Sequence, residues 1–163
     1  MVRDIPDGLK RMISHKPALH KVKWENLFSL DIPDAWAFHE EDGVISLFDD
    51  KDGVGVIQIS FAKRKSQQEP TVQEAIDFAV RYASQRGWAV SKKSMHALNI
   101  GLGKAPASEI SAQDNIDGEL NYWRVWHVMG KERMAFITYN CLVSDKNTEA
   151  TLCDLIIGSF EWI

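Results

Sequence analysis

Two acidic segments that end in glycine have the residue types of calcium-binding loops, but their spacing does not supply the ligands. With Gly53 at the sixth position of a calcium loop, Phe48 falls at the first position and Ile59 at the twelfth, where oxygen ligands are required. Gly118 gives the same result, because Arg124 then occupies the twelfth position. Both segments are predicted to be turns. The spacing of the five histidines and two cysteines also predicts no zinc site, and no cofactor motif is present.

Nucleophilic catalysis is not predicted either. Cys141 and His127 lie on neighbouring strand-like segments, as a thiol and imidazole pair would require, but the alternation of side chains puts them on opposite faces. Residues 101–106 have the glycine content of a phosphate-binding loop, yet they lack its spacing and lead into a strand instead of a helix. We therefore expect a protein that is not an enzyme.

One aromatic cluster does have the composition of a binding site. Tyr122, Arg124, Trp126 and Tyr139 are expected on one face of a sheet, and an arginine among aromatic rings is typical of a binding hot spot. The alternative is structural: the rings lie beneath a helix and the guanidinium reaches past them to solvent. Both interpretations stay open at this point.

Composition narrows the classes of protein. The chain has 163 residues, 19 Lys and Arg, 23 Asp and Glu, and a net charge of −4, which is typical of one soluble globular domain. The acidic balance argues against binding to nucleic acid through phosphate neutralisation. Apolar runs are too short to cross a membrane, and the first residues lack a secretion signal, so we expect a cytoplasmic protein. A homo-oligomer is left open.

The elements that position these residues follow a mixed pattern. Residues 1–23 are predicted to be a leader with a short helix over 7–15, and residues 24–163 a single α+β domain. Alternating residues predict an antiparallel meander of four strands over 28–62, and the basic run 63–65 is interpreted as a solvated linker.

Two helices and a hairpin complete the pattern. Thr71 and Glu74 form a predicted capping box, and Gly87 ends the helix that follows. Residues 119–129 and 132–143 are predicted to be a hairpin with a type II′ turn at Gly130-Lys131, which pairs Tyr122 with Tyr139. A last helix is expected to start at residue 144 or 145 and to end near Gly158.

The order of elements and two short motifs carry a resemblance to a known superfamily. The segment from Phe28 to Trp36, with its Pro33, and the ending Gly158-Ser159-Phe160-Glu161-Trp162 are similar to those of the PsbP-like superfamily, which includes photosystem II subunits and a Ran-binding import factor. The resemblance implies an α/β/α sandwich in which helices flank a central antiparallel sheet. It also implies functions that are mostly binding to other proteins, among them chaperones of secreted toxins.

These observations favour a non-enzymatic domain that binds another protein, as an adaptor, a chaperone or a toxin-neutralising partner. The alternative is a small-ligand-binding protein or an enzyme with a pocket on the sheet, in which Arg124 acts with His127 or His39. A strongly shifted histidine in an apolar cleft would favour the alternative, and an exposed aromatic patch would favour protein binding.

Overall fold

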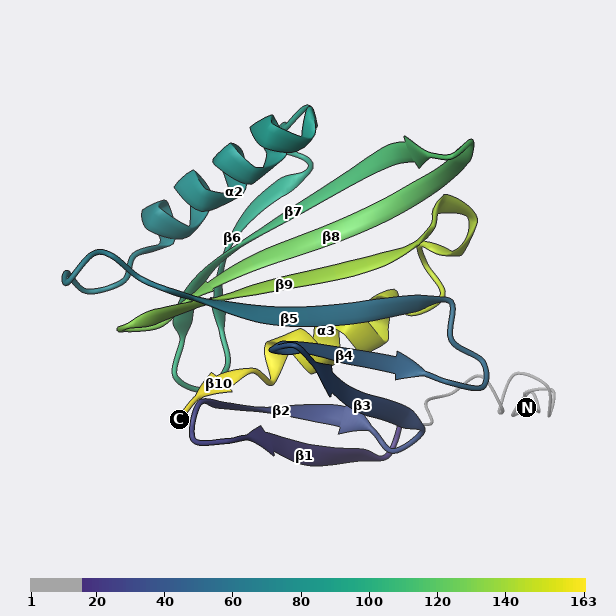
Figure 1. Ribbon diagram of the computed structural model, residues 1–163, viewed down its shortest axis with the longest axis horizontal. Coiled ribbons are helices and arrows are strands. Elements are labelled where there is room, and N and C mark those ends of the chain that lie inside the picture. Colours follow the sequence, from purple (N-terminus) through teal and green to yellow (C-terminus); the bar gives the residue numbers. More distant parts are fainter. Residues whose placement is uncertain (1–15) are drawn as a thin grey trace, which may run out of the picture.

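The computed structural model describes residues 16–163, which form a large antiparallel sheet, a small antiparallel sheet and two α-helices (Figure 1). The large sheet has the order β3-β4-β5-β9-β8-β7-β6. Its strands are β3 (Trp36–Glu41), β4 (Val44–Asp49), β5 (Gly55–Lys63), β6 (Met95–Ile100), β7 (Ala105–Ile116), β8 (Glu119–Met129) and β9 (Arg133–Leu142). The small sheet has the order β1-β2-β10, with β1 (Leu19–Trp24), β2 (Phe28–Pro33) and β10 (Glu161–Trp162). The predicted α+β fold with a central antiparallel sheet is confirmed.

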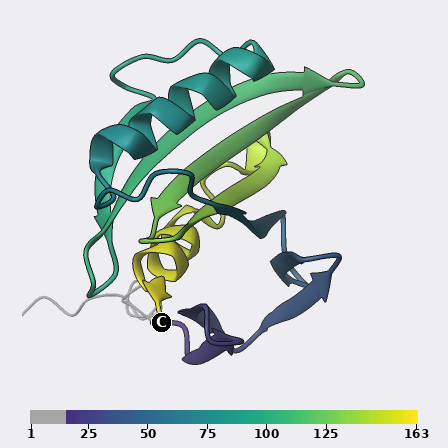
Figure 2. The ribbon, with the colours of Figure 1, turned by 60° about the vertical axis from the view of Figure 1, so that its left-hand side comes forward.

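The helices lie on opposite faces of the large sheet. Helix α2 (Val72–Arg86) covers one face over β6, β7 and β8, and we call this the outer face. Helix α3 (Ala150–Gly158) follows a short 3₁₀ helix, η1 (Val143–Asp145), and lies on the concave inner face, between the large and small sheets (Figure 2). The main core is therefore on the inner side, where β2, α3 and the large sheet bury Phe28, Ile156 and Trp126.

The start of α2 has one of the two hydrogen bonds of the predicted capping box. Thr71 accepts a hydrogen bond from the Glu74 amide at 3.1 Å, and Gly87 ends the helix with φ 70°, as predicted. The Glu74 carboxylate does not return to the cap. It binds Arg64 instead, whose side chain is 1% exposed, so the interpretation of residues 63–65 as a solvated linker is wrong at Arg64.

The β8–β9 hairpin has its turn one residue further along the chain than predicted. Met129 pairs with Met134 and Arg124 with Tyr139, a shift of two residues from the expected register. The turn spans residues 130–133, where the Gly130 amide donates to the Arg133 carbonyl at 2.8 Å, and Gly130 does not have the positive φ of a type II′ turn. A shift of two residues keeps every side chain on its predicted face, because the side-chain period is two.

Two other boundaries are corrected, the start of the meander and the start of the last helix. Strand β2 pairs with β1 and β10 and not with β3, so the meander begins only at β3. Strand β1 spans both sides of the expected boundary between residues 23 and 24, and the division into a leader and one domain stays a prediction. The expected helix over 7–15 lies outside the described residues. Helix α3 begins at Ala150, because buried Glu149 is held by the Tyr139 hydroxyl at 2.9 Å and the chain turns before it.

Candidate functional site

The four residues of the predicted aromatic cluster do come together on the inner face of β8 and β9. Trp126 and Tyr139 are fully buried, Arg124 is buried, and Tyr122 is half-buried. The Arg124 guanidinium lies 4.7 Å from the centre of the Trp126 ring. Helix α3 covers the cluster, as the structural alternative required, but the guanidinium is buried and does not reach past the rings to solvent. Binding of a partner at these four residues stays a prediction.

Arg124 has a full set of internal partners. Its Nε donates to Glu109 at 2.8 Å, one Nη donates to Asp154 of α3 at 2.6 Å, and the other donates to the Ala150 carbonyl at 3.4 Å. Burial lowers the pKa of Arg124, but the hydrogen bonds and charges of Glu109 and Asp154 outweigh it and raise the pKa above its ordinary value. This side chain fastens α3 to the sheet.

The groups invoked for an enzyme are not brought together. His127 is on the outer face of β8, Arg124 is on the inner face of the same strand, and His39 is an exposed residue of the edge strand β3. Burial raises the pKa of the Cys153 thiol to about 12, and Cys141 is also a free, buried cysteine. Within residues 16–163, no group of three His, Cys, Asp or Glu side chains is arranged to hold a metal ion.

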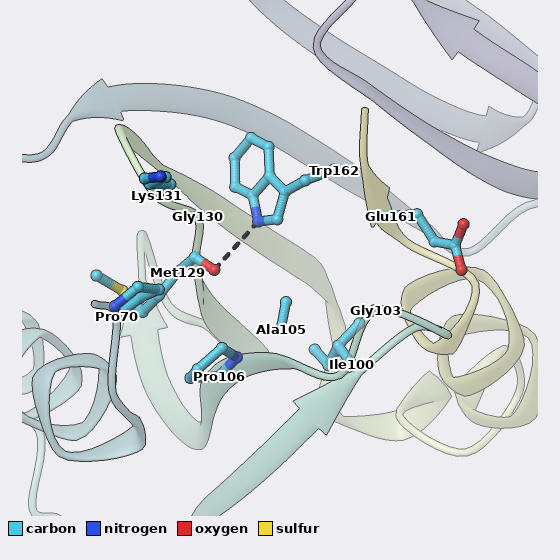
Figure 3. A pocket seen from close by; sticks show the side chains of 10 residues that line it. All are labelled: Pro70, Ile100, Gly103, Ala105, Pro106, Met129, Gly130, Lys131, Glu161 and Trp162. Carbon is cyan, nitrogen blue, oxygen red and sulfur yellow. Dashed lines mark hydrogen bonds between the residues drawn. The ribbon is translucent and has the colours of Figure 1, made fainter.

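A second surface, which we call the Trp162 surface, is formed where the C-terminal strand meets two hairpin turns. It consists of Leu102, Gly130, Lys131, Trp162 and the residues that line two hollows beside the indole. One hollow has a volume of about 230 Å³ and is walled by Ile100, Pro106 and Met129 (Figure 3). The other has a volume of about 310 Å³ and includes Leu27, Arg133 and Ile163.

Trp162 is fixed between these hollows. Its indole N–H donates to the Met129 carbonyl at 3.2 Å (Figure 3). Its ring packs edge-on against Phe160, with centroids 5.1 Å apart, and Phe160 stacks on Phe28 of the core. A side chain on Gly130 would come within 2.8 Å of the indole, so only glycine lets the turn backbone approach it this closely.

Leu102 lies in the β6–β7 turn and is 91% exposed; its neighbour Gly103, and not Leu102 itself, lines the first hollow. The turn is held on both sides: the Lys104 amide donates to the Gly101 carbonyl at 3.1 Å, and the Leu102 amide donates to Glu161 at 2.9 Å. Gly101 has φ 74°, and a side chain there would collide with the Phe160 carbonyl. An apolar side chain is thus presented to solvent by a fixed backbone.

Four cations and one carboxylate, Glu132, lie on this surface or in the groove that adjoins it. Lys63 and Arg133 lie directly opposite each other on β5 and β9, and like charges in that position are unfavourable. Lys65 and Lys131 line an adjoining groove with Lys63. In the described part of the chain, no carboxylate lies within 4.0 Å of any of these four cations.

Sequence reasoning missed the Trp162 surface. The loop predicted over Gly101–Pro106 is a turn only over residues 101–104, because Ala105 and Pro106 already pair with β6, and Glu161, which holds the turn, is 59 residues away from Leu102. The one local signal was a leucine placed between two glycines, where no neighbouring side chain could cover it.

Comparison with known proteins places the fold. The chain matches no family model and no curated protein sequence. Among solved structures it is similar to LpqN of Mycobacterium tuberculosis, with 15% identity, a TM-score of 0.64, and coverage of 91% of this chain and 87% of that one. It is also similar to the Ran-binding protein Mog1p of Saccharomyces cerevisiae, with 9% identity, a TM-score of 0.56, and coverage of 90% and 96%.

A third similar structure is larger than this chain. The match to a Bacteroides thetaiotaomicron protein has 15% identity and a TM-score of 0.61, and covers 83% of this chain but only 45% of that one. Together these likenesses show that the chain shares its fold with LpqN and with the Ran-binding Mog1p, as the predicted arrangement of sheet and helices implied. At these identities they show the fold and transfer no site residue.

Proposed function

We propose that this domain binds another protein through the Trp162 surface, without catalysing a reaction. The observation that carries the proposal is the exposed Leu102, held by a fixed turn beside an apolar hollow and a half-buried tryptophan. Binding hot spots have this composition, in which a few large apolar side chains are surrounded by a polar rim. A backbone fixed before binding also lowers the entropy lost when the complex forms.

The rim indicates the chemistry of the partner. Lys63, Lys65, Lys131 and Arg133 carry positive charge without internal carboxylates in the described residues, on a chain whose net charge is −4. We propose that the partner segment carries an apolar side chain, which enters the hollow beside Trp162, flanked by Asp or Glu residues. Opposite charges at a rim speed association and select the partner, and they do so less at high salt.

The similar structures support this type of function without identifying the partner. Mog1p is a Ran-binding protein, and LpqN is involved in cell envelope biogenesis. The described residues contain no helix that is both long and apolar enough to cross a bilayer. The predicted cytoplasmic location stays a prediction, as does the choice between adaptor, chaperone and toxin-neutralising partner.

Site-specific photo-crosslinking in cells tests the proposal. A photoreactive residue, p-benzoylphenylalanine, replaces Leu102, and in a matched control it replaces Leu120, which is 56% exposed at the opposite end of β8. We expect a protein adduct from position 102 that is absent from position 120. The double substitution Lys131→Glu with Arg133→Glu should reduce the adduct about tenfold or more, as the loss of two rim charges implies.

Two results would count against the Trp162 surface. Equal adducts from positions 102 and 120 would show that exposure alone explains the crosslink. An adduct that survives the charge reversal would show that the cations do not select the partner. An adduct of twice the chain's own mass would identify a second copy as the partner, and would exclude the acidic segment of a different protein.

A further inference from the structure

The outer face of the large sheet has a hollow of its own, which the proposed function does not use. Helix α2 covers β6, β7 and β8, and at its edge a cleft of about 420 Å³ opens over β9 and β5. Its aromatic walls are Phe78 and Tyr82 from α2 and Phe136 from β9, with Met134 beside them. The volume lies within the range of small-molecule sites.

His127 lies among these rings. Its imidazole stacks on Phe78 with centroids 6.2 Å apart, and it lies 5.3 Å from the Phe136 ring. The residue is 2% exposed, and its Nδ1 is buried with no hydrogen-bond partner in the part of the chain that the structure describes. An unpaired buried polar atom destabilises a fold, so a residue retained in this state calls for an explanation.

Other polar side chains border the cleft, but unlike His127 they are exposed or partly exposed. Ser60, Arg81, Tyr82 and Gln85 border it, and none of them makes a side-chain hydrogen bond to another described residue. A largely apolar cleft with a few convergent polar groups is the usual form of a small-ligand site. The four bordering groups are accessible from the cleft and could satisfy polar atoms of one molecule.

The charge of the cleft selects the class of ligand. Arg81 is the charged residue of the lining; its guanidinium lies 4.8 Å from the centre of the Phe78 ring, and no carboxylate of the described residues lies within 4.0 Å of it. Burial lowers the pKa of His127 to about 4, so the imidazole is neutral at pH 7 and adds no second charge. The lining is therefore aromatic, with one cation at its rim.

We propose that this cleft binds a small aromatic carboxylate. The ring of the ligand packs on the open sides of Tyr82 and Phe136, whose own ring centroids are 5.0 Å apart, and its carboxylate pairs with Arg81. Arginine suits this role because its planar fork of donors matches the two oxygens of a carboxylate. This site is separate from the Trp162 surface and does not depend on it.

A titration with a matched pair of probes tests this proposal. 2-Naphthoate and 2-naphthamide, which differ in the charge of one group, are added to ¹⁵N-labelled protein, and amide and imidazole NMR signals are recorded. We expect saturable shifts in α2, β8, β9 and the His127 ring with 2-naphthoate, and binding of 2-naphthamide weaker by about tenfold, the value of one charge-assisted hydrogen-bond pair.

Exposed arginines supply the variants. Arg81→Gln should weaken 2-naphthoate binding about tenfold and leave 2-naphthamide unchanged, whereas Arg133→Gln, at an exposed site on the Trp162 surface, should change neither. The proposal would be overturned by equal binding of the two probes or by an Arg81→Gln variant that keeps its affinity for 2-naphthoate. It would also be overturned if the shifts were confined to residues around Trp162, or if no shift were saturable. Because Leu102→Asp leaves the cleft intact, loss of protein binding in that variant with 2-naphthoate binding retained would separate the two sites.

Discussion

The two faces of strand β8 bury ionisable side chains in opposite ways. On the inner face, Arg124 is paired with Glu109 and Asp154 and stacks on Trp126. Three residues along, on the outer face, His127 is buried among Phe78, Phe136 and Tyr82 with no partner for its Nδ1 in the described residues. Both side chains belong to the same hairpin and have aromatic neighbours, so burial and ring contacts alone do not distinguish them.

The difference is whether internal groups satisfy the polar atoms. Arg124 uses its donors to join α3 to the sheet, and a partner molecule would have to break those bonds to use it. Nδ1 of His127 has no partner among the described residues, whereas Arg81 and Gln85 at the edge of the cleft are exposed to solvent. A buried, fully paired charge therefore stabilises the fold, whereas a buried and unpaired polar group is a place where a new hydrogen bond would add stability.

Substitution of Arg64 tests whether a buried charge stabilises the fold because it is paired, and not because of the sheet face on which it lies. The Arg64 guanidinium donates to both Glu74 oxygens, at 3.1 and 2.7 Å, and to the Lys131 and Gln68 carbonyls at 2.6 and 3.0 Å. Arg64→Met should lower the free energy of unfolding by about 4 kcal/mol, as expected when one partner of a buried ion pair is removed. Urea denaturation of this variant beside Lys65→Met, an exposed neighbour, measures the effect. A loss under 1 kcal/mol would contradict a structural role for pairing.

The next largest loss of stability is expected on substitution of Arg124. Arg124→Met leaves Glu109, whose side chain is 16% exposed, without its cation, and should cost about 3 kcal/mol. The cost should be smaller than for Arg64, because Asp154 is 64% exposed and can be solvated after the substitution. Glu109→Gln combined with Arg124→Met in a double-mutant cycle should recover part of the loss. Unchanged stability together with loss of a bound protein would instead make the Arg124 cluster a binding site.

The placement of these side chains on the two faces of β8 could be predicted from the sequence, because successive side chains of a strand point to alternate faces. Tyr122, Arg124 and Trp126 were expected on one face and His127 on the other, and a hairpin slip of two residues could not change that. The register of the hairpin could not be predicted, because the turn is held by Arg64, the residue that follows β5. The Arg64 guanidinium donates to the Lys131 carbonyl, and the Arg64 amide donates to the Glu132 carbonyl. Burial of Arg64 was equally hidden, since its neighbours are two exposed lysines.

The candidate sites were harder to predict than the fold for a related reason. Local patterns identify a strand, a cap or a turn, and so α2 was predicted with both of its ends. The Trp162 surface needs the β6–β7 turn, the β8–β9 turn and β10 to meet, and the outer cleft depends on how far α2 extends over β9. Spacing along the chain does not determine either of these.

The unpaired histidine should make stability depend on pH. Because burial lowers the pKa of His127 from 6.5 to about 4, the unfolded chain takes up a proton between these values and the folded chain does not. Stability from this group is therefore present above pH 6.5 and lost as the pH falls, by about 2 kcal/mol between pH 7.5 and pH 5.

The measurement is urea denaturation of the wild type and of His127→Phe at both pH values. The variant should lose about 2 kcal/mol less than the wild type over this interval, because it has no imidazole to protonate. His39→Phe, at an exposed histidine, should keep the wild-type pH dependence. Parallel curves for the wild type and His127→Phe would show that His127 has a partner in solution, and would remove the contrast between the two faces.

The smallest effects separate the two contacts at the start of α2. Thr71→Ala removes the acceptor for the Glu74 amide, at an exposed helix end where water can replace it, and should cost about 1 kcal/mol, with Thr71→Ser close to wild type. Glu74→Gln should cost more, because it leaves the buried Arg64 guanidinium without its countercharge. In an ordinary capping box the order would be reversed, since Gln serves there nearly as well as Glu. A larger loss for Glu74→Gln than for Thr71→Ala in urea denaturation would therefore show that the carboxylate serves the buried arginine and not the helix end.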